Sequence, residues 1–154
     1  MIKFKAHTAA AEHLTDLLIK SARGEGLESV AAFAAATGQR ASKRSFLEAS
    51  DPTTGEPWEP RRHEYPHPIL RETGTLWADV IGDYELDGAV ATVGIYVPQT
   101  SPAHEYAAKH QFGEESHLAD SIGELPARPF AGMSPEDVKR IVKFTLGPKG
   151  LLQT

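Results

Sequence analysis

The sequence predicts an α+β protein in which helices pack on a small antiparallel β-sheet, with a long proline-rich loop. Three observations indicate this class. Apolar residues recur at helical spacing before residue 50, alternating residues flank an Asp-Gly turn at residues 87–88, and a marked helix start lies at Ser134. We expect a single domain over residues 1–154, because a chain of 154 residues is too short for two ordinary domains.

The first part of the chain predicts two helices. Residues 8–23 carry leucines at helical spacing, and Gly24 follows where a helix would stop. Residues 27–49 predict a longer helix with a stripe of mostly small residues and Gly38 near its middle. Gly38 costs about 1 kcal/mol relative to alanine, so we expect a kink or a close contact there. Packing within the chain is the simpler interpretation of the stripe, and contact with a partner is the alternative.

A long loop over residues 50–68 interrupts the helical pattern. It opens with the turn sequence Asp51-Pro52-Thr53-Thr54-Gly55, and its further prolines exclude a helix or a central strand. We interpret it as an arm that orders on a partner or as a functional connection. Trp58, in its middle, either packs back onto its own domain or anchors an interface.

Two strands are expected next, over residues 75–86 and 89–97, joined by the hairpin signal Asp87-Gly88. Alternate residues of the second strand favour one face buried against the helices. The first strand is expected to begin with Trp77 and to carry a mostly acidic, solvent-exposed face formed by Asp79, Ile81, Asp83 and Glu85.

The remaining segments predict two more helices. Residues 104–112 favour one or two helical turns, with Glu105 and Lys109 at a favourable spacing, and residues 113–127 predict an exposed excursion. The last helix is the best marked, because Ser134 with Asp137 resembles a capping box and Pro135 suits a first turn. Its apolar stripe comprises Val138, Ile141, Val142 and Thr145.

Composition excludes several classes of function. The absence of cysteine excludes a disulfide framework, a thiolate metal site and a cysteine nucleophile. No apolar run approaches membrane-spanning length, and a net charge of −5 argues against a dedicated nucleic-acid binder. Charge is uneven, with acidic runs over residues 79–87 and 113–124 and a basic end. Such runs are either solvated faces or surfaces on which subunits meet acidic face to basic face.

No motif predicts catalysis or metal binding. His63 and His67 have the spacing of a helical metal site, but Pro66 and Pro68 prevent that helix. The sequence has no Gly-x-Ser-x-Gly elbow, although a pair of carboxylates close in space stays open. We therefore expect no cofactor, no metal and no enzymatic activity.

Five segments, in order, resemble the phage virion morphogenesis family of Mu-like phages. They are Phe46 with D-P-T-T-G-E-P-W-E-P at residues 51–60, I-L-R-E-T-G-T-L at 69–76, Val93-Gly94, Y-A-A-K-H-Q-F-G at 106–113, and L-P-A-R-P-F-A-G at 125–132 before the last helix. Any one alone would be weak, but five in the same order are specific.

This resemblance implies a structural virion protein, which completes or terminates the tail at the head–tail junction. It would form a homo-oligomeric ring, expected to be a hexamer, that contacts connector proteins on the head side and the tail tube protein on the tail side. DNA would pass through this ring without sequence-specific binding, and the ring would sit in the virion neck after assembly in the bacterial cytoplasm. The alternative is a transient assembly factor that is absent from the mature virion.

The expected contacts follow from this role. Trp58, Tyr106, His110 and Arg128 are the interface candidates. Tyr106 and His110 share a helical face, and His110 either donates to backbone in the core or contacts a neighbour. Arg128, held between Pro126 and Pro129, can fork onto a carboxylate of its own fold or of a neighbour. The candidates for residues that face the DNA channel, where negative charge would let the genome slide, are Asp79, Asp83, Glu85 and Asp87.

Overall fold

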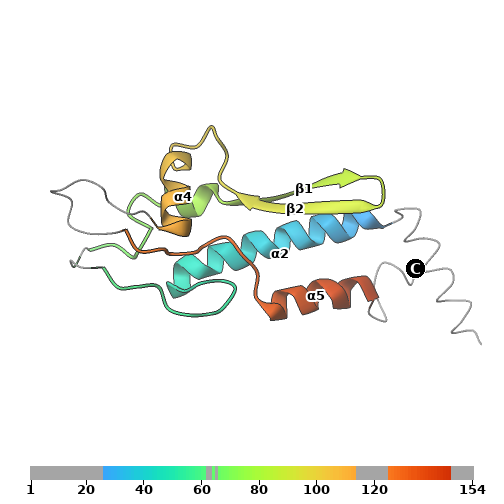
Figure 1. Cartoon of the computed structure of the whole chain (residues 1–154), viewed down its shortest axis with the longest axis horizontal. Coiled ribbons are helices and arrows are strands. Elements are labelled where there is room, and N and C mark those ends of the chain that lie inside the picture. Colours follow the sequence, from blue (N-terminus) through green and yellow to red (C-terminus); the bar gives the residue numbers. More distant parts are fainter. Residues whose placement is uncertain (1–25, 62–63, 65, 114–124, 147–154) are drawn as a thin grey trace, which may run out of the picture.

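The computed structural model describes residues 26–61, 64, 66–113 and 125–146. Within these ranges the predicted α+β class is confirmed, because helices lie against an antiparallel two-stranded sheet (Figure 1). The helix expected over residues 8–23 lies outside the described residues. The elements are α2 (Leu27–Glu48), α3 (Thr75–Asp79), β1 (Ile81–Asp87), β2 (Val90–Tyr96), α4 (His104–Phe112) and α5 (Pro135–Leu146).

The long helix α2 is the centre of the molecule, with the β1–β2 hairpin along one side and α5 along the other (Figure 1). It begins after Gly26, whose φ is 78°, and ends at Ala49, whose φ is 50°. The small residues of its stripe, Ala34, Thr37, Ala41 and Ser45, are buried, which confirms packing within the chain. A Cβ at Gly38 would lie 2.6 Å from Cδ1 of Ile95, so the glycine marks a close contact and the helix continues through it.

The hairpin is antiparallel as predicted, and its register runs from Ile81 opposite Tyr96 to Asp87 opposite Val90. Ala91, Val93 and Ile95 on one face of β2 are half-buried, whereas the side chains of Val90, Thr92 and Tyr96 on the other face are exposed, as expected.

The predicted strand over residues 75–86 was wrong at its start, because residues 75–79 form the short helix α3. Gly74, with a φ of 76°, begins the turn, and the Ala78 N–H donates to its carbonyl. The helix buries Leu76 in the core and lets the Trp77 indole donate to the carbonyl of Lys43, at 3.3 Å. These contacts with residues distant in the sequence stabilise a helical turn here, in place of the strand that the alternating pattern predicts.

The main core lies where α4, the loop after α2 and residues 128–131 meet. The ring of Phe46 lies edge-on to Trp58, 5.7 Å between centroids, and 5.3 Å from Phe130. A second aromatic contact, away from this core, joins α2 to α5. Phe33 of α2 stacks on Phe144 of α5, with 4.1 Å between the ring centroids. The buried members of the core are Phe46, Trp58, Leu76, Val80, Val97, Ala103, Ala107 and Phe130.

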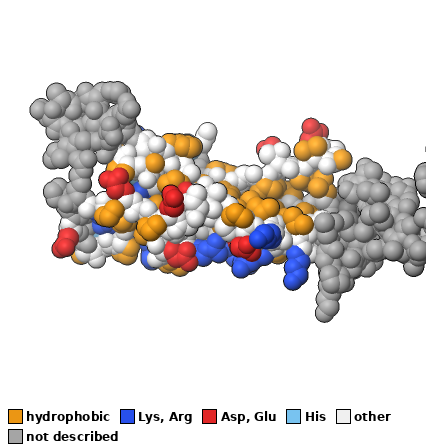
Figure 2. Space-filling view, turned by 60° about the horizontal axis from the view of Figure 1, so that its bottom comes forward, with side chains coloured by type: hydrophobic (Ala, Val, Ile, Leu, Met, Phe, Trp, Pro, Cys, Tyr) orange, Lys and Arg blue, Asp and Glu red, His pale blue; other side chains and the backbone are white. Residues whose placement is uncertain are grey.

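The described surface mixes basic, acidic and hydrophobic side chains on one face, with Lys and Arg gathered along one edge (Figure 2). Several large apolar side chains are exposed, above all Phe112 at the end of α4, which is 79% exposed. Among the described residues, no helix is both long and apolar enough to cross a bilayer.

Candidate functional site

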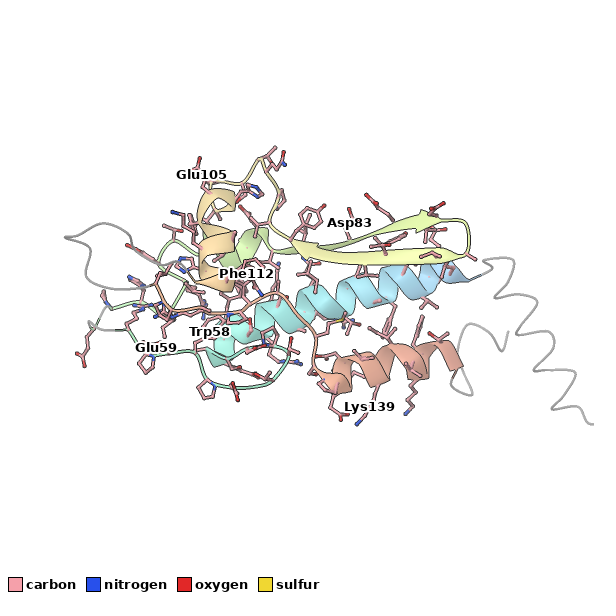
Figure 3. All side chains as sticks on the ribbon, in the orientation of Figure 1. Trp58, Glu59, Asp83, Glu105, Phe112 and Lys139 are labelled. Atoms are coloured by element: carbon pink, nitrogen blue, oxygen red, sulfur yellow. The ribbon has the colours of Figure 1, made fainter. Side chains whose placement is uncertain are left out.

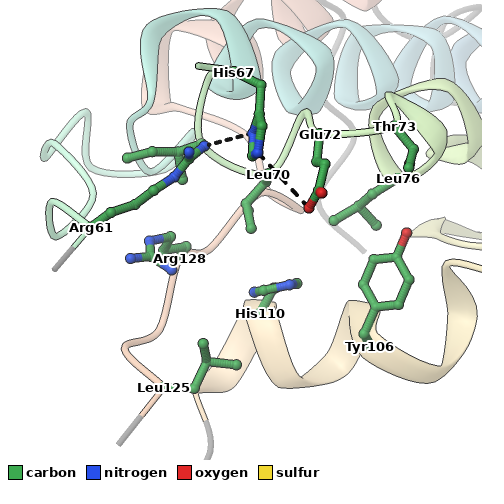
Figure 4. Close-up of a pocket in the computed structure, with 11 residues that line it drawn as sticks. Arg61, His67, Leu70, Glu72, Thr73, Leu76, Tyr106, His110, Leu125 and Arg128 are labelled. Carbon is green, nitrogen blue, oxygen red and sulfur yellow. Dashed lines mark hydrogen bonds and ion pairs between the residues drawn. The ribbon is translucent and has the colours of Figure 1, made fainter. Parts of the chain in front are cut away.

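The main candidate site is a cavity of about 730 Å³ between α4 on one side and Arg61 with residues 67–73 on the other (Figure 4). Its size is in the usual range of ligand pockets. Hydrophobic side chains form much of its wall, and basic and imidazole groups converge on one part of it (Figure 4). The residues that line it are Arg61, His67, Ile69, Leu70, Glu72, Thr73, Leu76, Tyr106, His110, Leu125 and Arg128.

Arg128 is the buried charge of this cavity, with only 7% of its surface exposed. Its N–H donates to the carbonyl of His110 at 2.7 Å, which ties its segment to α4. Its guanidinium donates from Nε and Nη2 to the carbonyl of Glu59, at 3.3 and 3.2 Å. The predicted fork onto a carboxylate of its own fold is not formed within the described ranges, since this acceptor is a backbone carbonyl.

The electrostatics of Arg128 reflect this unusual placement. Burial lowers its pKa, the Glu59 carboxylate raises it, and the neighbouring charge of Arg61 lowers it further. An arginine nevertheless keeps its charge in proteins. The site therefore contains a desolvated cation, which is costly unless it is paired.

His110 lies beside Arg128 and has an unsatisfied ring nitrogen. Its Nδ1 is buried with no hydrogen-bond partner among the described residues. The ring meets Tyr106 edge-on at 5.8 Å, which confirms that these two residues share a helical face. Burial lowers the pKa of His110, and the charge of Arg128 lowers it further, so the neutral ring is favoured.

The opposite wall of the cavity carries its own charge network. Nε2 of His67 lies 3.9 Å from the carboxylate of Glu72, and Nη2 of Arg61 lies 3.3 Å from Nδ1 of the same ring (Figure 4). The side chain of Glu72 is 78% exposed, and its contact with His67 is an ion pair only when the imidazole is protonated. Next along the wall, Leu70 has a φ of 58°, a left-handed conformation that is rare for a bulky residue and favoured at strained or functional positions.

Of the two alternatives predicted for Trp58, the structure shows packing onto its own domain, because the residue belongs to the core. Its side chain is 5% exposed, and its indole N–H donates to the carbonyl of Pro129 at 2.8 Å. The start of the loop folds back as well, since the Trp58 N–H donates to the carbonyl of Ala49. Trp58 therefore positions the segment that carries Arg128.

Gln111 is a positioning residue that sequence reasoning missed. Its side-chain Oε1 accepts the N–H groups of Phe130 and Ala131, both at 2.9 Å. This clamp joins the segment at residues 106–113 to that at 125–132. The sequence contained a signal for this contact, because residues 106–113 and 125–132 are both among the segments that resemble the family.

The acidic residues of the hairpin lie away from the cavity, toward the other end of the molecule. Asp83, Glu85 and Asp87 are exposed on β1, and Asp83 points away from α2 (Figure 3). Asp79 was wrongly placed on that face, because it lies on α3 and accepts a hydrogen bond from the Ser101 hydroxyl at 2.5 Å. Within one chain, the structure therefore does not bring the acidic residues of the hairpin close to the interface candidates at the cavity.

The described residues include no group of three or more His, Cys, Asp or Glu side chains arranged to hold a metal ion. The cavity combines a buried cation, a neutral imidazole and apolar walls, which suits an acidic group on an apolar stem.

Comparison with known proteins connects this architecture to a family. A model described as the phage virion morphogenesis family matches residues 6–146, which include the hairpin, the Gln111 clamp and the Arg128 segment. No curated protein and no solved structure matches the chain. The chain therefore belongs to the phage virion morphogenesis family.

Proposed function

We propose that this phage virion morphogenesis protein is a structural component of the virion neck, where it completes or terminates the tail. In this proposal its copies form a ring of six that caps the tail and joins it to the head. Its neighbours would be connector proteins on one side and the tail tube protein on the other. The role consists of contacts, so it requires no catalysis, cofactor or membrane.

The exposure of large apolar side chains is the observation that carries this proposal. Phe112 is 79% exposed, Val90 62%, and Val138 and Val142 of α5 are 47% and 49% exposed. Phe112 also borders an open groove of about 400 Å³ between α4 and β2, whose wall includes Ile95. Apolar surface on several elements is stabilised when subunits cover it, at about 25 cal/mol per Å².

The interface candidates gain a common location in this proposal. Tyr106, His110 and Arg128 all border the same cavity, so a single neighbouring subunit would contact them together. Trp58 would act indirectly, by holding the Pro129 carbonyl and with it the Arg128 segment.

The outer face of the hairpin would line the DNA channel. Asp83 and Glu85 point from the middle of β1 on this face. Negative charge there would repel phosphates and let DNA slide, whereas a basic face would hold it.

The test is the composition and image of purified virions. Mass spectrometry should find the chain at a fixed number of copies per particle, and electron microscopy should place it as a ring in the neck. Absence from mature virions, together with loss of tailed particles when the gene is silenced, would identify the transient assembly factor instead. Normal tailed particles without the chain would contradict both roles.

A further inference from the structure

We propose that the cavity beside α4, which Arg128 lines, binds the tip of the β1–β2 hairpin of a second copy. In this contact the carboxylate of Asp87 pairs with the guanidinium of Arg128. The inference rests on the proposed ring, and it names the contact that closes the ring.

The buried cation indicates the charge of the occupant. The guanidinium of Arg128 has more N–H donors than the Glu59 carbonyl uses, and no described carboxylate forms an ion pair with it. The acid on the opposite wall, Glu72, lies beside His67, and no ion pair joins it to Arg128 among the described residues. A carboxylate from outside would accept the remaining donors, and it would lie beside the unsatisfied Nδ1 of His110.

The tip of the hairpin has the matching chemistry. Asp87 is exposed and forms no ion pair with any described residue, whereas Asp83 accepts a hydrogen bond from the Tyr96 hydroxyl. Leu86 and Val90, on either side of the turn, are 45% and 62% exposed.

The walls of the cavity complement this tip. They combine the charged corner with apolar side chains, so a carboxylate flanked by exposed apolar residues fits both parts. The apolar wall residues are Ile69, Leu70, Leu76, Tyr106 and Leu125.

The geometry of the chain favours a contact between copies. α4 and the segments around the cavity gather at one end of the described structure, and the turn of the hairpin lies at the other (Figure 1). A tip therefore cannot reach the cavity of its own chain. Contact between different surfaces of successive copies is heterologous, and such contacts close into a ring when the rotation permits.

A cysteine pair tests this contact directly, because the natural chain has no cysteine. We expect the double variant Asp87→Cys with Leu125→Cys to form disulfides between copies. Electrophoresis without reductant should then show a ladder that ends at the ring size, and a reductant should collapse it. The matched control, Asp83→Cys with Leu125→Cys, places the thiol on the same strand but away from the tip, and should give no ladder.

Charge variants give an independent measurement. Asp87→Asn should weaken association by about thirtyfold or more, because it leaves the buried charge of Arg128 unpaired. Arg128→Lys keeps the charge but loses the fork, so it should weaken association as well. Asp83→Asn should leave association unchanged, and the melting temperature of each variant reports whether the subunit is folded.

The outcomes separate this inference from the proposed function. The hairpin contact alone would be overturned if native mass spectra show rings of the natural chain but the introduced thiols at positions 87 and 125 form no disulfide. Equal effects of Asp87→Asn and Asp83→Asn on those rings would overturn it as well. A chain that never self-associates, in isolation or in the virion, would overturn the ring and this contact together.

Discussion

Gly82 determines how closely the hairpin can lie on α2. A Cβ at this position would overlap the carbonyl oxygen of Ala35, which belongs to the helix backbone and cannot turn aside as a side chain can. The glycine therefore lets two main chains approach each other directly. We regard it as the residue on which the packing of the sheet most depends.

Gly82→Ala should lower the free energy of unfolding by about 1–3 kcal/mol, the usual cost of overpacking. Urea unfolding followed by circular dichroism measures the change. Gly94→Ala is the matched control on the outer face of the same hairpin, where the nearest atom, Cδ1 of Tyr96, is 3.8 Å from the added Cβ. Equal losses in the two variants would contradict this role for Gly82.

His110 makes stability depend on pH. Burial, helped by the charge of Arg128, lowers the pKa of this histidine below its ordinary value of 6.5. The unfolded chain therefore binds a proton more readily than the folded chain. Stability should be complete above pH 6.5 and should fall as the pH drops from there toward the lowered pKa.

The experiment is urea unfolding of the natural chain and of His110→Gln on both sides of pH 6.5. The variant should lose the part of the pH dependence that the histidine contributes. Tyr106→Phe should keep it, because it changes the other ring of the pair without removing a group that titrates near neutral pH. An unchanged dependence in His110→Gln would refute the assignment.

At the scale of elements, the start of α5 is the best example of a local signal that the fold uses. The Ser134 hydroxyl accepts the N–H of Asp137, and the Asp137 carboxylate accepts the N–H of Ser134, so the predicted capping box is confirmed. The same carboxylate forms an ion pair with Arg44 of α2 at 3.0 Å. One acid thus caps α5 and joins it to α2.

The pKa of Asp137 records the balance of these contacts. Burial alone would raise it, but the hydrogen bonds from Ser134 and the guanidinium of Arg44 outweigh burial and lower it. The stability that these contacts contribute is present above the ordinary value of 3.8 and is lost as the pH falls through the lowered pKa.

Ser134→Ala should lower the free energy of unfolding by about 1 kcal/mol, the usual cost of losing an N-cap. Ser134→Thr keeps a hydroxyl at the same position and should retain most of the stability. Thermal unfolding of both variants measures the difference. If threonine proves as harmful as alanine, the hydroxyl is not what stabilises this helix start.

The start of the predicted first strand shows where element prediction failed. Alternation favoured a strand from Thr75, but Leu76 packs in the core and Trp77 donates to Lys43 of α2 from a helical turn. Those partners are far away in the sequence, so the local pattern contained no sign of them.

At the scale of the whole molecule, the acidic hairpin and the cavity of Arg128 lie far apart along its length. The acidic hairpin lies toward one end, and α4 with the segments around the Arg128 cavity lies at the other (Figure 1). The double variant Asp83→Lys with Glu85→Lys tests the proposed channel face. Particles should assemble in normal numbers but lose infectivity, because basic side chains would hold DNA phosphates.

Electron microscopy and plaque counts on the same preparation measure assembly and infectivity separately. The neutral pair Asp83→Asn with Glu85→Gln should be intermediate, since it removes repulsion without adding attraction. Loss of assembled particles in the lysine variant would instead indicate that this face packs against another subunit.

The sequence by itself determined the α+β class, the extents of α2 and α4, the start of α5, the hairpin turn and the family. These features depend on signals within a few residues, such as the capping box at Ser134 and the turn at Asp87-Gly88. Only the tertiary structure decided the helical state of α3, the burial of Trp58 and the cavity around Arg128. Each of these depends on partners far apart in the chain, as Trp58 and Pro129 are, separated by 71 residues. Local patterns contain no information about such contacts, because only packing brings their members together.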